Sequence, residues 1–90
     1  MLFRSPNDFL KIYPNPTSKY LNIKFEGQND FTDCKVRVIS VLGQEMKLLS
    51  QIDLKNGIKA IDIQDLKSGV YFLEIFKEEN LIATQKIIKE

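Results

Sequence analysis

The chain has 90 residues, 43% of them hydrophobic, and its 13 lysine and arginine residues against 12 aspartate and glutamate residues leave a net charge of +1. This length accommodates one domain with one modest core, and the near-neutral charge gives no electrostatic basis for binding nucleic acid or an anionic membrane surface. No apolar run approaches the ~18 residues of a transmembrane segment, and residues 1–4 lack a signal-peptide pattern. We interpret residues 1–8 as a linker end, in a piece of a longer protein, and residues 9–90 as a folded domain.

Apolar and polar residues alternate along most of the chain with the period of two that is typical of β-strands. Tyr20–Glu26 is the clearest case, because its apolar residues, beginning with Leu21, fall on one face. The predicted strands are Phe9–Tyr13, Tyr20–Glu26, Cys34–Val41, Glu45–Ile52, Ile58–Ile63, residues 70–76 and Leu81–Lys89.

Turn-forming residues separate these segments. Tyr13-Pro14-Asn15-Pro16 follows the first strand, and it predicts a rigid extended turn because the residue before each proline is held extended and neither proline donates a ladder hydrogen bond. The alternative is that it serves only to end the strand. Leu42-Gly43-Gln44 predicts a tight hairpin with Gly43 in the left-handed conformation, and Asn56-Gly57 predicts a second turn.

We expect the rest of the domain to be organised around the segment from Leu66 to Ile75. Gly69 suits a backbone with positive φ at the entry to a strand. Both faces of the strand that follows are largely apolar, which predicts a central strand, covered by a second sheet on one side and partly covered on the other. The ring of Tyr71 is expected in the core, with its hydroxyl bonded at the rim.

Seven short strands without a convincing helical period predict an all-β fold, an immunoglobulin-like β-sandwich of about seven antiparallel strands in two sheets. The spacing of Met46, Leu49 and Ile52 would also suit a helix over residues 45–54, but the flanking turn signals favour a hairpin return. The cysteine pair and core tryptophan of a true immunoglobulin domain are absent. The predicted core consists of Leu21, Ile23, Val36, Val38, Ile61, Ile63, Tyr71, Leu73 and Ile75.

Few residues suit catalysis or metal binding. There is no histidine, and the one cysteine, Cys34, cannot form a zinc site or an intrachain disulfide, so we expect it to pack as a small hydrophobic residue. Asp62 and Asp65 could bind calcium or act as an acid/base pair, although an outward strand residue and a turn-forming aspartate are the favoured interpretation. Lys86 and Lys89 could be solvated edge residues that discourage strand addition. We expect no cofactor and no enzymatic activity.

Five motifs follow one another along the chain. They are Tyr13-Pro14-Asn15-Pro16-Thr17-Ser18, Leu21-Asn22-Ile23, the segment from Val36 to Glu45, the segment from Ile61 to Leu73, and Lys86-Ile87-Ile88-Lys89. Each motif alone is a common turn or strand signal. The ordered set, from about Phe9 to the last residue, resembles the type A C-terminal sorting domain of the type IX (Por) secretion system.

The resemblance implies an immunoglobulin-like β-sandwich at the end of an exported protein of Bacteroidetes-type bacteria, which is secreted or held at the cell surface after crossing the periplasm and the outer membrane. The implied partners are an N-terminal cargo protein, the outer-membrane secretion translocon and a sortase-like peptidase. In many parent proteins this peptidase removes the domain in the linker before Tyr13 and joins the cargo to an anionic lipopolysaccharide. The recognition residues implied by the match are Pro14, Asn15, Pro16, Gly69, Tyr71, Lys86, Ile87, Ile88 and Lys89.

Residue physics is compatible with this role, because a terminal strand with a free end could offer its backbone to a partner's sheet edge. The alternative is an accessory β-sandwich binding module of a secreted protein, of carbohydrate or adhesin type. Such a module would present an exposed aromatic platform, whereas the predicted outward aromatic residues, Tyr20 and Phe72, are few and scattered. A small enzyme has almost no support in the sequence.

Overall fold

The structure is a computed structural model, which describes residues 10–14, 16–25, 33–52 and 58–90. These residues form seven β-strands and no helix, and they accordingly include no helix that could cross a membrane. The strands are β1 (Leu10–Tyr13), β2 (Tyr20–Phe25), β3 (Cys34–Ser40), β4 (Glu45–Ile52), β5 (Ile58–Asp62), β6 (Gly69–Lys77) and β7 (Asn80–Lys89).

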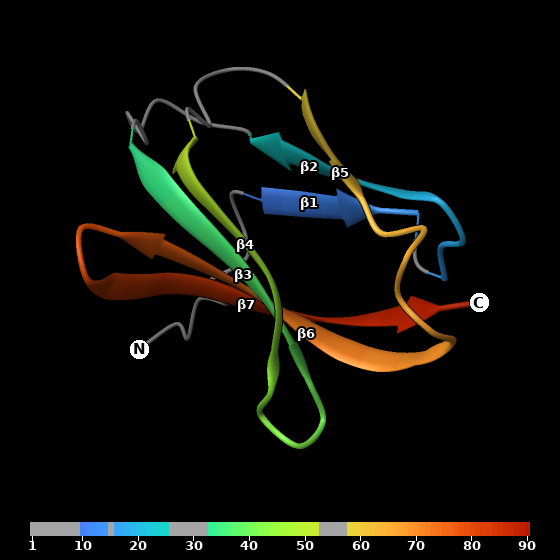
Figure 1. Ribbon diagram of the computed structural model, residues 1–90. Helices are drawn as coiled ribbons and strands as arrows, with labels where there is room; N and C mark the ends of the chain where they lie inside the picture. Colours follow the sequence, from blue (N-terminus) through green and yellow to red (C-terminus); the bar gives the residue numbers. More distant parts are fainter. Residues whose placement is uncertain (1–9, 15, 26–32, 53–57) are drawn as a thin grey trace, which may run out of the picture.

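Two antiparallel sheets pack face to face in the predicted β-sandwich. One sheet has three strands in the order β1-β2-β5, and the other has four in the order β4-β3-β6-β7 (Figure 1). The predicted strands are therefore confirmed, with small changes at their ends. The predicted linker end, Asn15 and the Asn56-Gly57 turn lie outside the described residues.

The core lies between the sheets and contains all nine residues predicted for it. Alternation produces this result, because in a half-covered strand every second side chain points to the facing sheet. Cys34 is also fully buried, as expected for a small hydrophobic residue. The further buried apolar residues are Ile52, Leu66, Ala83 and Ile87.

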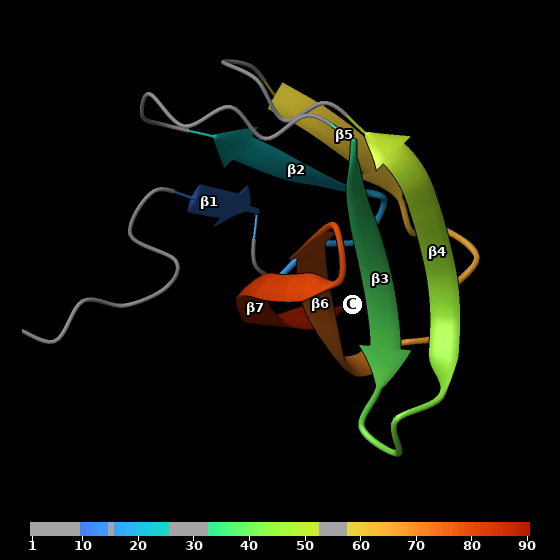
Figure 2. The ribbon, with the colours of Figure 1, turned by 90° about the vertical axis from the view of Figure 1, so that its left-hand side faces the viewer.

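Strand β4 is part of a hairpin, so the helical alternative for residues 45–54 is wrong where the structure describes them. Gly43 has φ of +85°, in the left-handed region predicted for the turn between β3 and β4. Ile52 faces the core, whereas Met46 and Leu48 are exposed. The hairpin projects beyond the body of the sandwich (Figure 2).

Strand β6 is central, because it pairs with β3 on one side and with β7 on the other. The connection from β5 to β6 crosses from one sheet to the other, and a hydrogen bond from Tyr71 stabilises it. Tyr71 is buried, and its hydroxyl donates a 2.7 Å hydrogen bond to the carbonyl oxygen of Lys67, four residues upstream. This is the arrangement of the tyrosine corner in immunoglobulin-like sandwiches, and it provides the predicted partner at the rim.

Gly69, the first residue of β6, has φ of +157°, so the prediction of a positive φ at this position is confirmed. An added Cβ would meet the Tyr71 ring at 3.9 Å, an ordinary contact, so the cost of a side chain lies in the backbone. We expect Gly69→Ala to lower the free energy of unfolding by about 1 kcal/mol. Urea denaturation measures the change, and a midpoint equal to that of the wild type would contradict it.

Candidate functional site

Three motifs from distant parts of the sequence meet at one end of the four-stranded sheet. Lys89 lies directly opposite Gly69 in the β6–β7 register, and Ile87 lies opposite Tyr71. On the other side of β7, Thr17 forms a parallel bridge to Lys89. In Figure 1 the end of β7 accordingly lies beside the start of β6. We call this group of residues, Thr17, Gly69, Tyr71 and Lys86–Lys89, the terminal corner.

Side chains of the last strand alternate between the core and the outer face of the sheet. Ile87 is completely buried and Lys89 is only 8% exposed, whereas Lys86 is exposed and Ile88 is 39% exposed. The prediction that Lys89 is a solvated edge residue is therefore wrong. Lys89 is two residues after Ile87, so the aliphatic part of its side chain points to the same, inner face of the sheet. Its Nζ donates a 3.0 Å hydrogen bond to the Glu90 carbonyl oxygen. Lys86 agrees with the prediction.

The end of β7 is bonded on both sides, which corrects the expectation of a free strand end. The Thr17 amide donates to the carbonyl oxygen of Ile88 at 2.9 Å, and the Glu90 amide donates to the carbonyl oxygen of Thr17 at 2.8 Å. Thr17 is 2% exposed. The predicted recognition set omits this residue, because no local sequence pattern indicates that a threonine after a proline turn pairs with a residue as distant as Lys89.

Pro14 and Pro16 lead the chain from β1, in the three-stranded sheet, to the bridge with β7 in the four-stranded sheet. Both prolines are exposed, and the Tyr13–Pro14 peptide bond is cis. A segment that changes sheets in this way forms a corner of the sandwich. The structure thus brings Pro16 next to the terminal corner through Thr17, while Asn15 lies outside the described residues.

The two aspartates considered for calcium have other partners. Asp62 Oδ1 accepts a hydrogen bond from the Gln64 amide at 2.9 Å, which makes it the acceptor of an Asx turn. Asp65 pairs with Lys47 Nζ at 2.8 Å, and this hydrogen bond lowers the pKa of the Asp65 carboxyl below its usual value. No group of three potential metal ligands occurs among the residues that the structure describes. These contacts agree with the structural roles favoured from the sequence.

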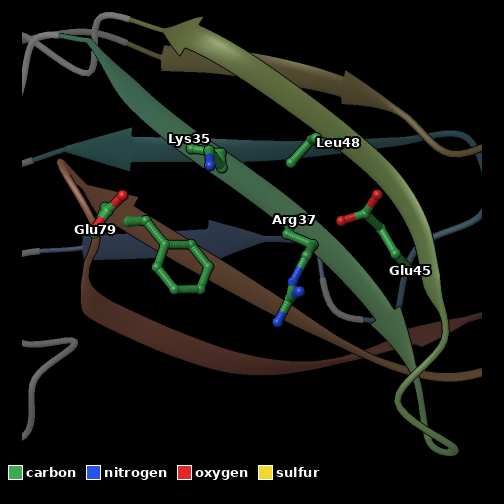
Figure 3. A pocket seen from close by; sticks show the side chains of 6 residues that line it. Lys35, Arg37, Glu45, Leu48 and Glu79 are labelled. Atoms are coloured by element: carbon green, nitrogen blue, oxygen red, sulfur yellow. The ribbon is translucent and has the colours of Figure 1, made fainter.

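A shallow hollow of about 300 Å3 lies on the outer face of the four-stranded sheet, away from the terminal corner. Lys35, Arg37 and Leu48 lie around it in Figure 3. Arg37 is held by Glu74 on the neighbouring strand, with 2.8 Å between Nε and Oε1, and lies 5.6 Å from the centre of the Phe76 ring. The Arg37 side chain at the hollow is therefore held by cross-strand ion-pair and aromatic contacts, and Glu45 and Glu79 complete the polar part of the lining.

Exposed aromatic side chains are sparse over the described part of the sandwich. Tyr20 is exposed, as predicted, but its hydroxyl accepts a 3.3 Å hydrogen bond from Gln64 Nε2. Phe72 is half-buried on the outer face of the four-stranded sheet. Tyr13 is exposed on the three-stranded sheet. The aromatic residues named for a binding platform thus lie on different sheets.

Comparison with known proteins identifies the family. Residues 11–90 match the model of the secretion system C-terminal sorting domain. The chain is also 36% identical over 83 residues to beta-agarase D of Zobellia galactanivorans, an alignment that covers 92% of this chain and 15% of the agarase. The matched range contains the whole terminal corner, and the β-sandwich agrees with the fold that the ordered motifs imply. The chain belongs to the C-terminal sorting domains of the type IX secretion system, which direct exported proteins to the cell surface or the extracellular space.

Proposed function

We propose that the terminal corner is the surface by which the secretion machinery recognises this sorting domain. The observation that supports the proposal is the convergence of motifs. The basic terminal motif on β7 lies between the Gly69–Tyr71 motif on β6 and Thr17, which follows the two prolines, at one end of the sheet. They are far apart in sequence, and one partner could contact all three at once.

Within this corner, we assign direct contact to the outward residues and support to the inward ones. Lys86 lies opposite Phe72, and Ile88 lies opposite Val70, so one positive charge borders a half-exposed apolar strip. A partner surface with a carboxylate beside apolar side chains would complement it. Ile87 and Lys89 face the core and hold β7 in place. We assign this partner surface to the outer-membrane translocon.

The remaining parts of the proposal concern the parent protein. A cargo lies N-terminal to the domain, whose bounds we place at residues 9–90 after the linker end at residues 1–8, and a sortase-like peptidase acts in the linker before Tyr13. The peptidase joins the cargo to lipopolysaccharide. The domain acts as a signal and carries no catalytic activity of its own, in agreement with the Asx-turn and ion-pair roles of Asp62 and Asp65.

Lys86→Ala tests the recognition surface. Because an exposed lysine contributes only tenths of a kcal/mol to stability, the melting temperature of the purified domain should stay nearly unchanged. Delivery of a fused reporter to the cell surface should fall several-fold, with accumulation in the periplasm. Changing Lys89 as well would confuse the result, because its stem is buried.

Lys35→Ala is the matched control. Lys35 is also an exposed lysine on the outer face of the four-stranded sheet, but it lies on β3, away from the terminal corner. Fractionation of cells that carry each variant compares the two directly. Equal export of the Lys86→Ala, Lys35→Ala and wild-type reporters would exclude Lys86 as a recognition residue.

A further inference from the structure

Thr17 is placed to control the position of the terminal motif. Its main chain makes both hydrogen bonds of the parallel bridge, accepting from the amide of Glu90 and donating to the carbonyl of Ile88. Because Gly69 pairs with Lys89 from the opposite side, the last residues of β7 are held between two neighbours. The bridge to Thr17 links this end of β7 to a segment outside the β6–β7 hairpin.

The Thr17 side chain connects this contact to the other sheet. Its hydroxyl donates a 2.6 Å hydrogen bond to the carbonyl oxygen of Tyr20, the first residue of β2. The residue is 98% buried, so loss of this hydrogen bond would not be replaced freely by water. The hydroxyl therefore fixes the Thr17 backbone relative to β2, and the Thr17 backbone in turn fixes the end of β7.

We infer that Thr17 is a positioning residue, which holds Lys86–Lys89 in the arrangement that the secretion machinery recognises. This inference rests on the proposed function of the terminal corner. It assigns to a hydroxyl group a role that reaches the outward Lys86 and Ile88 through the backbone, without contact between Thr17 and the partner. Release of the bridge would change the geometry of Lys86–Lys89 without changing their sequence.

Thr17→Val tests the role of the hydroxyl with little change in side-chain volume, and Thr17→Ser retains the hydroxyl. Ser18→Ala is the control for loss of an adjacent, exposed hydroxyl. Amide hydrogen exchange of the folded domain, followed by NMR, reports the bridge at Glu90 and global opening at Leu73 in the centre of the sheet. We expect exchange at Glu90 to become about tenfold faster in Thr17→Val, with Leu73 changed much less. Thr17→Ser and Ser18→Ala should resemble the wild type.

Export of the fused reporter supplies the functional measurement. Thr17→Val should reduce surface delivery, and Thr17→Ser should restore it. Unchanged exchange at Glu90 in Thr17→Val would overturn the inference. Faster exchange at Glu90 with normal export of Thr17→Val would also overturn it, provided that Lys86→Ala still reduces export. If Thr17→Val does not fold, exchange in the wild type decides, because a Glu90 amide without protection means that the bridge does not hold. Normal export of Lys86→Ala would refute the recognition surface, a result that the exchange measurement does not affect.

Discussion

Tyr71→Ala is expected to lower the free energy of unfolding by about 3–4 kcal/mol. The change removes an aromatic ring that is 6% exposed in the core and also the hydroxyl that fastens the connection between the two sheets. Truncation of a buried aromatic side chain leaves a cavity in addition to the lost apolar burial, which accounts for the size of the effect. Urea denaturation of the purified domain measures it.

Tyr71→Phe separates the two contributions. It keeps the ring and removes only the hydrogen bond to the carbonyl of Lys67, so the expected loss is about 1 kcal/mol. Both variants should reduce export in proportion to the unfolded fraction if recognition requires a folded corner. A denaturation midpoint of Tyr71→Ala equal to that of the wild type would contradict the burial of the ring.

Ile87→Ala and Ile88→Ala are expected to differ strongly in stability although the residues are neighbours. Ile87 is fully buried opposite Tyr71, so its truncation should cost about 3 kcal/mol. Ile88 is 39% exposed on the outer face, and its truncation should cost about 1 kcal/mol or less. Thermal melting of the two variants measures this difference.

The export assay then distinguishes a residue that holds β7 in place from one that contacts the secretion machinery. Ile88→Ala should impair delivery of the reporter while the domain stays folded, because its side chain belongs to the proposed contact surface. Ile87→Ala should impair delivery only to the extent that it unfolds the domain, and growth at lower temperature should restore part of it. Similar stability losses in both variants would show that the assigned orientation of β7 is wrong.

The strands and the core were predictable because their signals are local. Alternation along β2 and β3 identifies inward residues such as Leu21 and Val36 without knowledge of any partner strand, and Gly43 marks its turn in the same way. The motif from Leu66 to Tyr71 also combines local features, since the Tyr71 hydroxyl bonds a carbonyl only four residues away. The burial of the Tyr71 ring and the bonding of its hydroxyl at the rim were therefore predictable, although the identity of the acceptor was not.

The orientation of β7 and the role of Thr17 were not predictable by the same means. Ile87 and Ile88 are both apolar, so the sequence of the last strand does not indicate which of them, and hence which lysine, faces the core. A bulge between Ile75 and Phe76 also shifts the register of β7 against β6. Thr17 pairs with Lys89 across almost the whole chain, and a single threonine after a turn has no pattern that reveals such a partner.

The bridge between Thr17 and Lys89 also determines when in the life of the protein the corner can exist. Contacts between residues so distant in sequence form slowly, because the intervening chain must be ordered before the contact stabilises it. During synthesis, residues 86–89 leave the ribosome after every other strand, so a nascent chain without them has the proline and Gly69–Tyr71 motifs but no assembled corner. Under the proposed recognition, a machinery that contacts the assembled corner selects folded molecules over unfolded ones, because the corner exists only after Thr17 and Lys89 have paired.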